Sequence, residues 1–159
     1  MTHESFGPTI LLRSEASRDR VGIVELAVPA GWIGPPLHHH EFDEAFYVVD
    51  GEITFQLGDA LFTAGPGALA FAPGGVEHTL ANLSDAPARY VLLCTPAGFE
   101  GYFARLAAEA AGAEPPAWAL APTPPVTTVG GQIRERGDVA AAAPIAPGAG
   151  GINVLTRSE

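Results

Sequence analysis

Short runs of β-type residues, separated by glycine, proline and aspartate turns, constrain the fold of this chain most strongly. Eight such runs follow one another between residues 8 and 95, namely 9–12, 21–28, 44–49, 52–57, 61–64, 68–71, 78–83 and 89–95. One strand about every 8 to 12 residues is typical of an antiparallel sandwich or barrel. The pattern therefore predicts an all-β fold.

Two dipeptides mark reversals between these runs. Asp50-Gly51 has the composition of a type I′ hairpin turn, in which both central residues need a positive φ. Gly58-Asp59 has the composition of a second turn. We therefore expect tight connections between the strands on either side of each dipeptide.

The apolar pattern changes after residue 95 to a spacing of three and four. The apolar positions of this stretch are Phe99, Tyr102, Phe103, Leu106 and Ala110. They predict an amphipathic helix over about 98–111, with Glu100 among the charged residues of its polar face. Thr95 is expected to be its N-cap residue, with Pro96 in the first turn, and Gly112 is expected just after its C-terminus.

The length of 159 residues fits one domain. We expect residues 1–112 to form a β-barrel domain with the helix, and residues 113–159 to form a proline- and glycine-rich extension. Five prolines between positions 114 and 125 predict an extended segment on the surface. A terminal strand is expected at 152–155.

Charge and composition narrow the classes of partner. Lys and Arg number 8 against 18 Asp and Glu, so the net charge is −10 at pH 7. A surface this acidic repels phosphate backbones and anionic headgroups, so we expect neither a nucleic acid nor a membrane partner. Charged residues interrupt any apolar leader within residues 1–20, which favours a cytoplasmic protein. Cys94 is the single cysteine, so no internal disulfide can form.

A histidine cluster is the strongest indication of chemistry. In an extended chain, side chains alternate, so His38 and His40 share one face and His39 lies on the other. Glu44 opens the next β run, and His78 opens a later one. Three imidazoles and a carboxylate suit a divalent transition metal, namely Fe, Mn, Ni, Cu, Co or Zn. Four such ligands leave two octahedral positions open for substrate or dioxygen.

These residues resemble the two sequence motifs of the cupin superfamily. The first motif resembles His38, His40, Glu44 and Gly51, and the second is similar to Gly67, Pro73, Gly75, His78 and Asn82. One departure is Trp32, which stands where the motif has its leading glycine. The resemblance covers residues 8 to about 95.

The resemblance, most of all to small single-domain quercetinase-like cupins, implies a jelly-roll β-barrel with a metal in its mouth. It carries His38, His40, Glu44 and His78 over as metal ligands. It further implies a dioxygenase, in which Glu44 leaves the metal to act as general base with a pKa raised by an apolar pocket. Cupin-like barrels commonly pair, so a homodimer is expected.

The residues beside the ligands predict a substrate pocket. Phe46 and Val48 share the face of Glu44, and Val76 and Leu80 flank His78 on its face. An apolar lining favours a small apolar or aromatic substrate, although the same side chains could simply fill the barrel. Two other functions stay open: a metal-dependent isomerase or cyclase without redox chemistry, and a small-molecule-binding cupin without catalysis.

Overall fold

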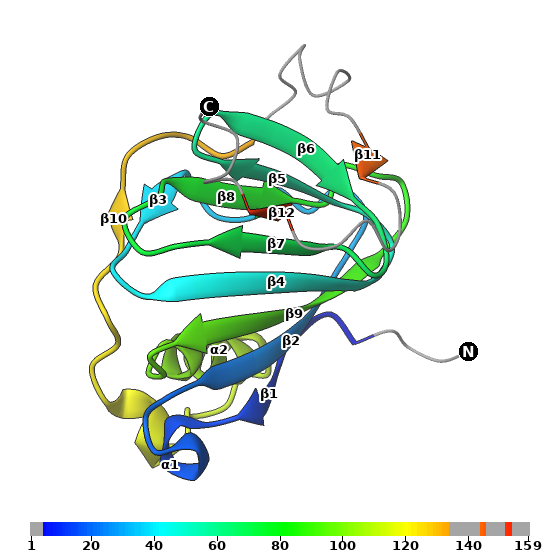
Figure 1. The fold of residues 1–159 in the computed structure, drawn as a ribbon. Helices are drawn as coiled ribbons and strands as arrows, with labels where there is room; N and C mark the ends of the chain where they lie inside the picture. The colour runs from blue at the N-terminus through cyan, green and yellow to red at the C-terminus, as the bar shows by residue number, and fades with distance from the viewer. Residues whose placement is uncertain (1–4, 134–143, 146–151, 154–159) are drawn as a thin grey trace.

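The computed structural model describes residues 5–133, 144–145 and 152–153, which form two facing six-stranded sheets (Figure 1). The first sheet has the order β1 (Gly7–Leu12), β2 (Gly22–Val28), β9 (Ala88–Thr95), β4 (Asp43–Asp50), β7 (Leu69–Ala72) and β12 (Ile152–Asn153). The second has the order β10 (Thr127–Thr128), β3 (His38–His39), β8 (His78–Ala81), β5 (Ile53–Leu57), β6 (Ala60–Ala64) and β11 (Pro144–Ile145). The predicted all-β jelly roll is confirmed.

The core lies between the two sheets. Along β2 and β9 every second residue is buried, as expected for strands with one face on a core. Phe46 of β4 meets Phe55 of β5 across this core, with ring centroids 5.5 Å apart. All eight predicted β runs are strands whose ends agree to within two residues.

The predicted hairpin at Asp50-Gly51 is wrong. Strands β4 and β5 on either side of it lie in different sheets, and of these two residues Gly51 alone has a positive φ, 71°. A jelly roll passes the chain from one sheet to the other here, so the dipeptide marks a crossing. Gly58-Asp59, by contrast, does join paired strands, β5 and β6.

Helix α2 (Glu100–Ala110) confirms the predicted helix, but its start differs. The N-cap residue is Phe99, so Thr95 and Pro96 lie before the helix. Glu100 was expected on the polar face, yet it is buried, with 1% of its surface exposed. Its carboxylate faces the short helix α1 (Ser14–Ser17) because α2 packs against the neighbouring strand β1. Gly112 follows the helix with φ 62°, as predicted.

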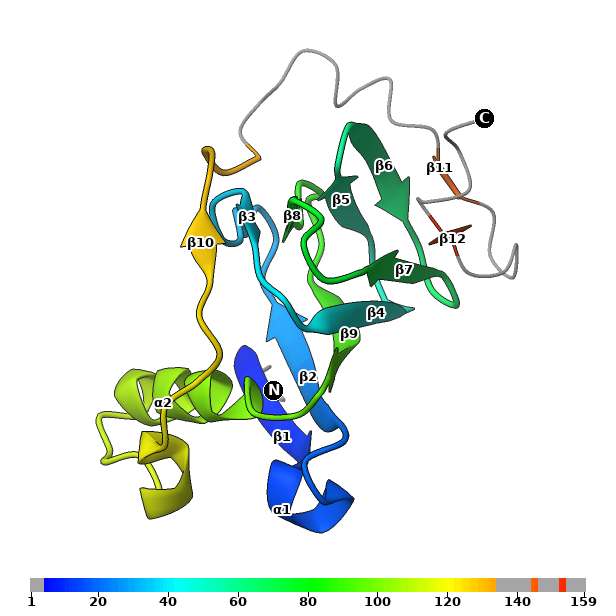
Figure 2. The same cartoon turned by 60° about the vertical axis from the view of Figure 1, so that its left-hand side comes forward.

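After α2 the chain forms a 3-10 turn, η1 (Ala117–Leu120), and then residues 121–133, which we call the strap. The strap returns along the second sheet, where β10 pairs with β3 (Figure 2). The predicted extended surface segment 114–125 is mostly exposed, but it contains η1, in which Ala119 is buried. Ile133, at the end of the strap, is fully buried.

Further along the chain, β12 pairs in parallel with β7, within the predicted terminal strand 152–155, of which residues 154–155 lie outside the described part. In the described part of the chain, no helix is both long and apolar enough to cross a membrane.

Candidate metal centre

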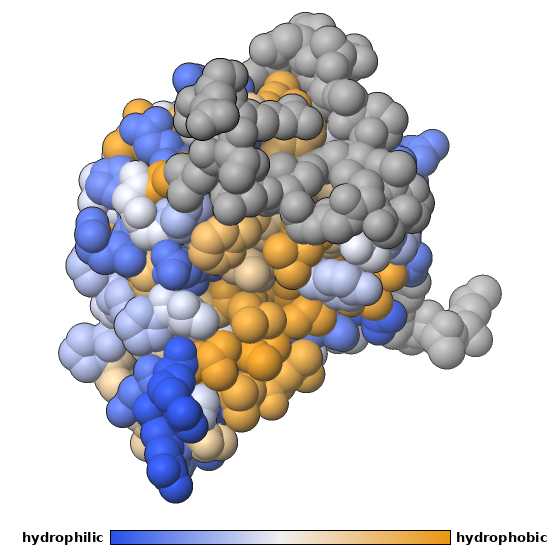
Figure 3. All heavy atoms as spheres, in the orientation of Figure 1, coloured by the Kyte–Doolittle hydropathy of each residue, from blue (hydrophilic) through white to orange (hydrophobic). Residues whose placement is uncertain are grey.

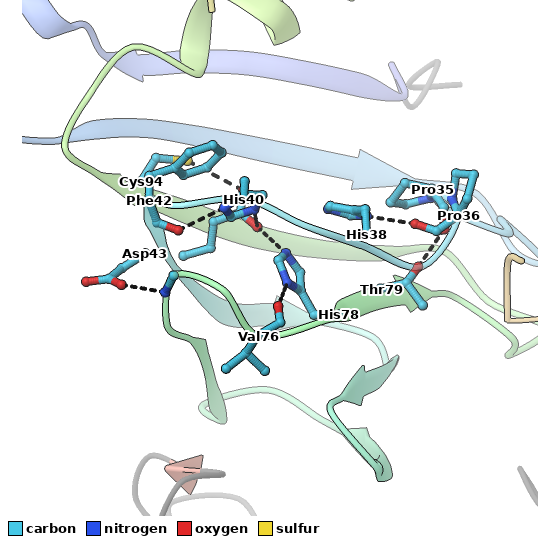
Figure 4. A network of polar contacts seen from close by, with 12 residues as sticks. Pro35, Pro36, His38, His40, Phe42, Asp43, Val76, His78, Thr79 and Cys94 are labelled. Carbon is cyan, nitrogen blue, oxygen red and sulfur yellow. Dashed lines mark hydrogen bonds and ion pairs between the residues drawn. The ribbon is translucent and has the colours of Figure 1, made fainter. Parts of the chain in front are cut away.

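The fold brings the four predicted ligands together. Figure 4 shows three of them, His38, His40 and His78, with their backbone partners. His38 lies on β3 and stands opposite His78 on β8, while His40 follows β3 and Glu44 lies on β4. One donor atom from each of the four side chains lies within 4.8 Å of the others. Residues from three strands thus face a common point.

All three imidazole rings are held in the same tautomer. Each Nδ1 lies within hydrogen-bond distance of a backbone carbonyl two residues away, and a carbonyl can only accept, so Nδ1 carries the proton. The three contacts are His38 to Pro36 (2.7 Å), His40 to Phe42 (2.8 Å) and His78 to Val76 (2.8 Å). In the neutral rings the lone pair therefore sits on Nε2, which faces the centre of the cluster.

The arrangement of these lone pairs fits a bound cation. Nε2 of His78 lies 2.9 Å from Glu44 Oε2, and Nε2 of His40 lies 3.2 Å from the same oxygen. Neither neutral nitrogen can donate to the carboxylate, and His40 Nε2 is buried without a hydrogen-bond partner among the described residues. Lone pairs packed this closely need a second proton or a metal ion. Three nitrogens and one carboxylate are a donor set that suits divalent transition metals.

The electrostatics of Glu44 differ from the expectation. Burial raises the pKa of its carboxyl, but hydrogen bonds and positive charge from His40 and His78, when these rings carry a second proton, lower it further, so that the resulting pKa is about 2. The expected rise in pKa is therefore wrong, because the histidines outweigh the apolar surroundings. Burial also lowers the pKa of His38, which favours the neutral ring that a metal needs.

Cys94 lies on the other side of the Glu44 carboxylate. Its Sγ is 3.7 Å from Glu44 Oε1, and the thiol is the donor in this contact. Burial, together with the nearby carboxylate, raises the pKa of Cys94, so the thiol stays protonated. The contact leaves Glu44 Oε2 to face the histidines.

The turn 73–75 fixes the connection that carries His40. Gly75 donates its N–H to the His40 carbonyl at 2.7 Å, and Gly74 donates to Asp43 Oδ1 at 2.7 Å (Figure 4). A Cβ atom on Gly74 would overlap the backbone carbonyl of Glu41. The sequence shows a turn here, but only the fold shows that this turn holds a metal ligand.

A cavity of about 820 Å³ lies beside the four ligands, and His38 and Glu44 form part of its wall. Its other walls come from the inner face of the first sheet, from α2 and from the strap. Aromatic residues that line the cavity are Phe6, Trp32, Phe46, Tyr90, Phe99, Tyr102 and Phe103.

Of the predicted pocket residues, Phe46 and Leu80 line this cavity. Val48 is instead fully buried in the core, and Val76 contacts the His78 ring through its carbonyl. No local signal in the sequence indicates that α2 and the strap form walls of this cavity.

Comparison with known protein families agrees with the motifs. The family described as Cupin domain matches residues 24–94, which include all four ligands. Residues 24–94 form a cupin domain. The buried Asn82 of the second cupin motif donates to the carbonyls of Pro29 and Ala86. Its role in this cupin is to fix a loop outside the metal centre.

Solved structures share the fold of this cupin. The protein TT1209 from Thermus thermophilus is 27% identical, with a TM-score of 0.51 over 60% of this chain and 87% of that one. A predicted oxalate decarboxylase from Thermotoga maritima is 21% identical, with a TM-score of 0.53 over 56% and 78%.

The polyketide cyclase RemF from Streptomyces resistomycificus is 21% identical, with a TM-score of 0.54 over 77% of this chain and 69% of that one. The last two likenesses concern the fold alone. Among curated proteins, none matches the chain.

Proposed function

We propose that this cupin is a metal-dependent dioxygenase that acts on a small apolar or aromatic metabolite. The observation that carries the proposal is the cavity of about 820 Å³, whose wall includes the ligands His38 and Glu44 and is otherwise mostly apolar and aromatic. A divalent transition metal held by His38, His40, Glu44 and His78 would supply a Lewis acid and, where the ion is redox-active, electron transfer to dioxygen.

The lining of the cavity argues against an anionic substrate. No lysine or arginine is among its lining residues in the described part of the chain, and Glu44 contributes a negative charge. Away from the metal, a buried anion would have no positively charged side chain beside it, which would be costly. An uncharged aromatic molecule instead gains stabilisation from the apolar surface that it covers.

Within this proposal Glu44 is both ligand and catalytic base. Its carboxylate is ionised, and it would accept a proton from a substrate hydroxyl after parting from His40 and His78. The Cys94 thiol contacts Oε1 of Glu44 from the opposite side. To move away from His40 and His78, the carboxylate must therefore either rotate about this contact or break it. Glu44→Gln removes the base and keeps the shape, so it should abolish turnover.

The test begins with metal analysis of the purified protein, followed by incubation with flavonoid, diketone and catechol panels, with and without oxygen. A dioxygenase places both atoms of O₂ in the products, which ¹⁸O₂ labelling measures. His78→Ala should lose activity, and the outward-facing His39→Ala should keep it. Turnover without oxygen would show that the protein is instead an isomerase or cyclase. Binding without turnover would show that it is a binding protein.

We also propose that the protein forms a homodimer through the outer face of the first sheet. A row of apolar side chains crosses this face from strand to strand, namely Ile23, Leu93, Ala45 and Phe71. Figure 3 shows apolar surface gathered over β2, β9 and β4 on this side. The nearby Glu25 and Arg89 lie 3.7 Å apart and offset each other's charge.

The charge of the protein favours a second copy of this chain as the partner that covers this face. Two chains with a net charge of −10 repel each other least where the facing surfaces carry little net charge. Leu93→Asp should therefore convert the dimer to a monomer in sedimentation. Leu120→Asp, at an exposed position on η1, is the matched control and should leave the dimer intact. A Leu93→Asp protein that still sediments as a dimer would refute this interface.

A further inference from the structure

We propose that the Tyr90 hydroxyl is a second anchor for the substrate, at a distance from the metal centre, and that it donates a hydrogen bond to an oxygen atom of the bound molecule. This inference rests on the proposed function and names its substrate class more closely. The ligand would be a flat, uncharged, mainly aromatic molecule with one oxygen at the metal end and another at the Tyr90 end.

The hydroxyl of Tyr90 has no hydrogen-bond partner among the described residues. The side chain is buried, with 2% of its surface exposed, and it lines the cavity. None of the hydrogen bonds between described residues involves its oxygen. Unlike His40 Nε2, this oxygen is not sealed by protein atoms, so it faces the open space of the cavity. Buried polar groups are nearly always hydrogen-bonded, so the missing partner belongs in the cavity.

The register of the sheet places Tyr90 away from the metal. Along β9 the inward positions are Cys94, opposite Glu44, then Leu92, and then Tyr90. Four residues of strand separate Tyr90 from Cys94, which corresponds to about 13 Å. A ligand that contacts both ends must therefore span much of the cavity.

Aromatic rings lie between the two ends. The Phe46 ring centroid is 6.2 Å from the His78 ring and 6.2 Å from the Tyr90 ring, so at most twice that distance separates the outer two. The Trp32 ring lies 6.4 Å from that of Tyr90. A flat ring system that covers Phe46 could reach both polar ends while its faces contact aromatic walls.

The charge state of the anchor suits a neutral ligand. Burial and the negative charge of Glu44 raise the pKa of Tyr90, so the phenol stays protonated at neutral pH and can donate. A carbonyl or hydroxyl oxygen on the ligand would accept this bond. A carboxylate there would again be a buried anion without a lysine or arginine beside it.

The test compares two probes that differ by one distal oxygen, 2-naphthol and 2,6-dihydroxynaphthalene. Both are titrated without oxygen into the zinc-loaded full chain, and binding is followed by calorimetry. For Tyr90→Phe we expect the Kd of 2,6-dihydroxynaphthalene to rise about fivefold, because a neutral hydrogen bond is lost, and the Kd of 2-naphthol to change less than about twofold. Tyr47→Phe removes an outward-facing hydroxyl and should leave both values unchanged.

The outcomes separate this inference from the proposed function. Equal weakening of both probes in Tyr90→Phe would show a structural role and overturn the anchor, as would no weakening or no binding to the wild-type protein. Metal content is measured on the zinc-loaded protein, and oxygen consumption on protein loaded with Fe, Mn, Ni, Cu or Co, because zinc is not redox-active. A protein that shows the probe difference with zinc but consumes no oxygen with any of the redox-active ions would refute the dioxygenase and leave the anchor standing.

Discussion

Glu100 gives the sharpest test of how this fold is held together. Its buried carboxylate accepts the Ser14 N–H at 2.6 Å and the Gly98 N–H at 2.7 Å, so it joins α1 to the segment that leads into α2. A Cβ atom on Gly22 would overlap the same carboxylate. Glu100→Gln keeps the size of this side chain but turns an NH₂ group toward one of the two N–H donors.

The cost follows from these two contacts. A hydrogen bond to a charged group contributes about 1.5 to 3 kcal/mol, and Gln keeps one of the two bonds in weakened, neutral form. We therefore expect the free energy of unfolding to fall by about 3 kcal/mol. For a chain of this length the melting temperature should fall by about 9 °C.

The effect should depend on pH in a defined direction. The pKa of Glu100 is lowered: burial alone would raise it, but the N–H groups of Gly98 and Ser14 outweigh burial. A group with a lowered folded-state pKa stabilises fully above its unfolded value, about 4.3, and loses this contribution as the pH falls through the folded value. The stability gap between wild type and Glu100→Gln should be widest near neutral pH and shrink below about pH 4.

Urea unfolding followed by circular dichroism between pH 7 and pH 3 measures this gap. Glu109→Gln, near the far end of the same helix and on its surface, is the matched control and should change stability by less than about 0.5 kcal/mol. If Glu100→Gln matched the control at pH 7, or if its gap widened in acid, the account of this carboxylate would be wrong.

Three predictions concern the metal centre. His40→Ala should remove most of the bound metal in elemental analysis, while His39→Ala, whose side chain is not among the clustered ligands, should retain it. Affinity for Zn²⁺ should fall steeply below about pH 6, because protons compete for the imidazoles; titrations at pH 8 and pH 5 that agree would contradict histidine ligation. Gly74→Ala should weaken metal binding because its Cβ would overlap the Glu41 carbonyl, whereas Gly75→Ala, with φ 84° and open space around it, should cost about 1 to 2 kcal/mol of stability and spare the metal.

The strands and the ligands could be predicted because both follow from local rules. A period of two locates a strand, and the same alternation puts His38 and His40 on one face. Partner choice between strands is not local, and for this reason the composition of Asp50-Gly51 wrongly indicates a hairpin. The prediction that Glu100 lies on the polar face was wrong for a related reason, since its position in the helix does not indicate that Ser14 lies beside it.

The wall of the cavity was the least predictable part. Tyr90 lies on a strand that was predicted, but its unpartnered hydroxyl is visible only once its neighbours are placed. The five prolines at 114–125 predicted an extended surface segment, but they do not indicate that the strap goes on to pack at its end, where Ile133 is fully buried. Its pairing with β3 depends on two threonines, Thr127 and Thr128, which carry no distinctive pattern.

The strap also sets an order of events during synthesis. Thr128 of the strap pairs with His38 of β3. The strand that carries the first metal ligand in the sequence therefore gains this partner strand only from a segment that is synthesised much later. A ribosome delivers the N-terminal part first, and β3 then has one open edge until the strap emerges. Full metal affinity is thus expected only of chains translated through Ile133, and nascent or truncated chains should hold the ion weakly.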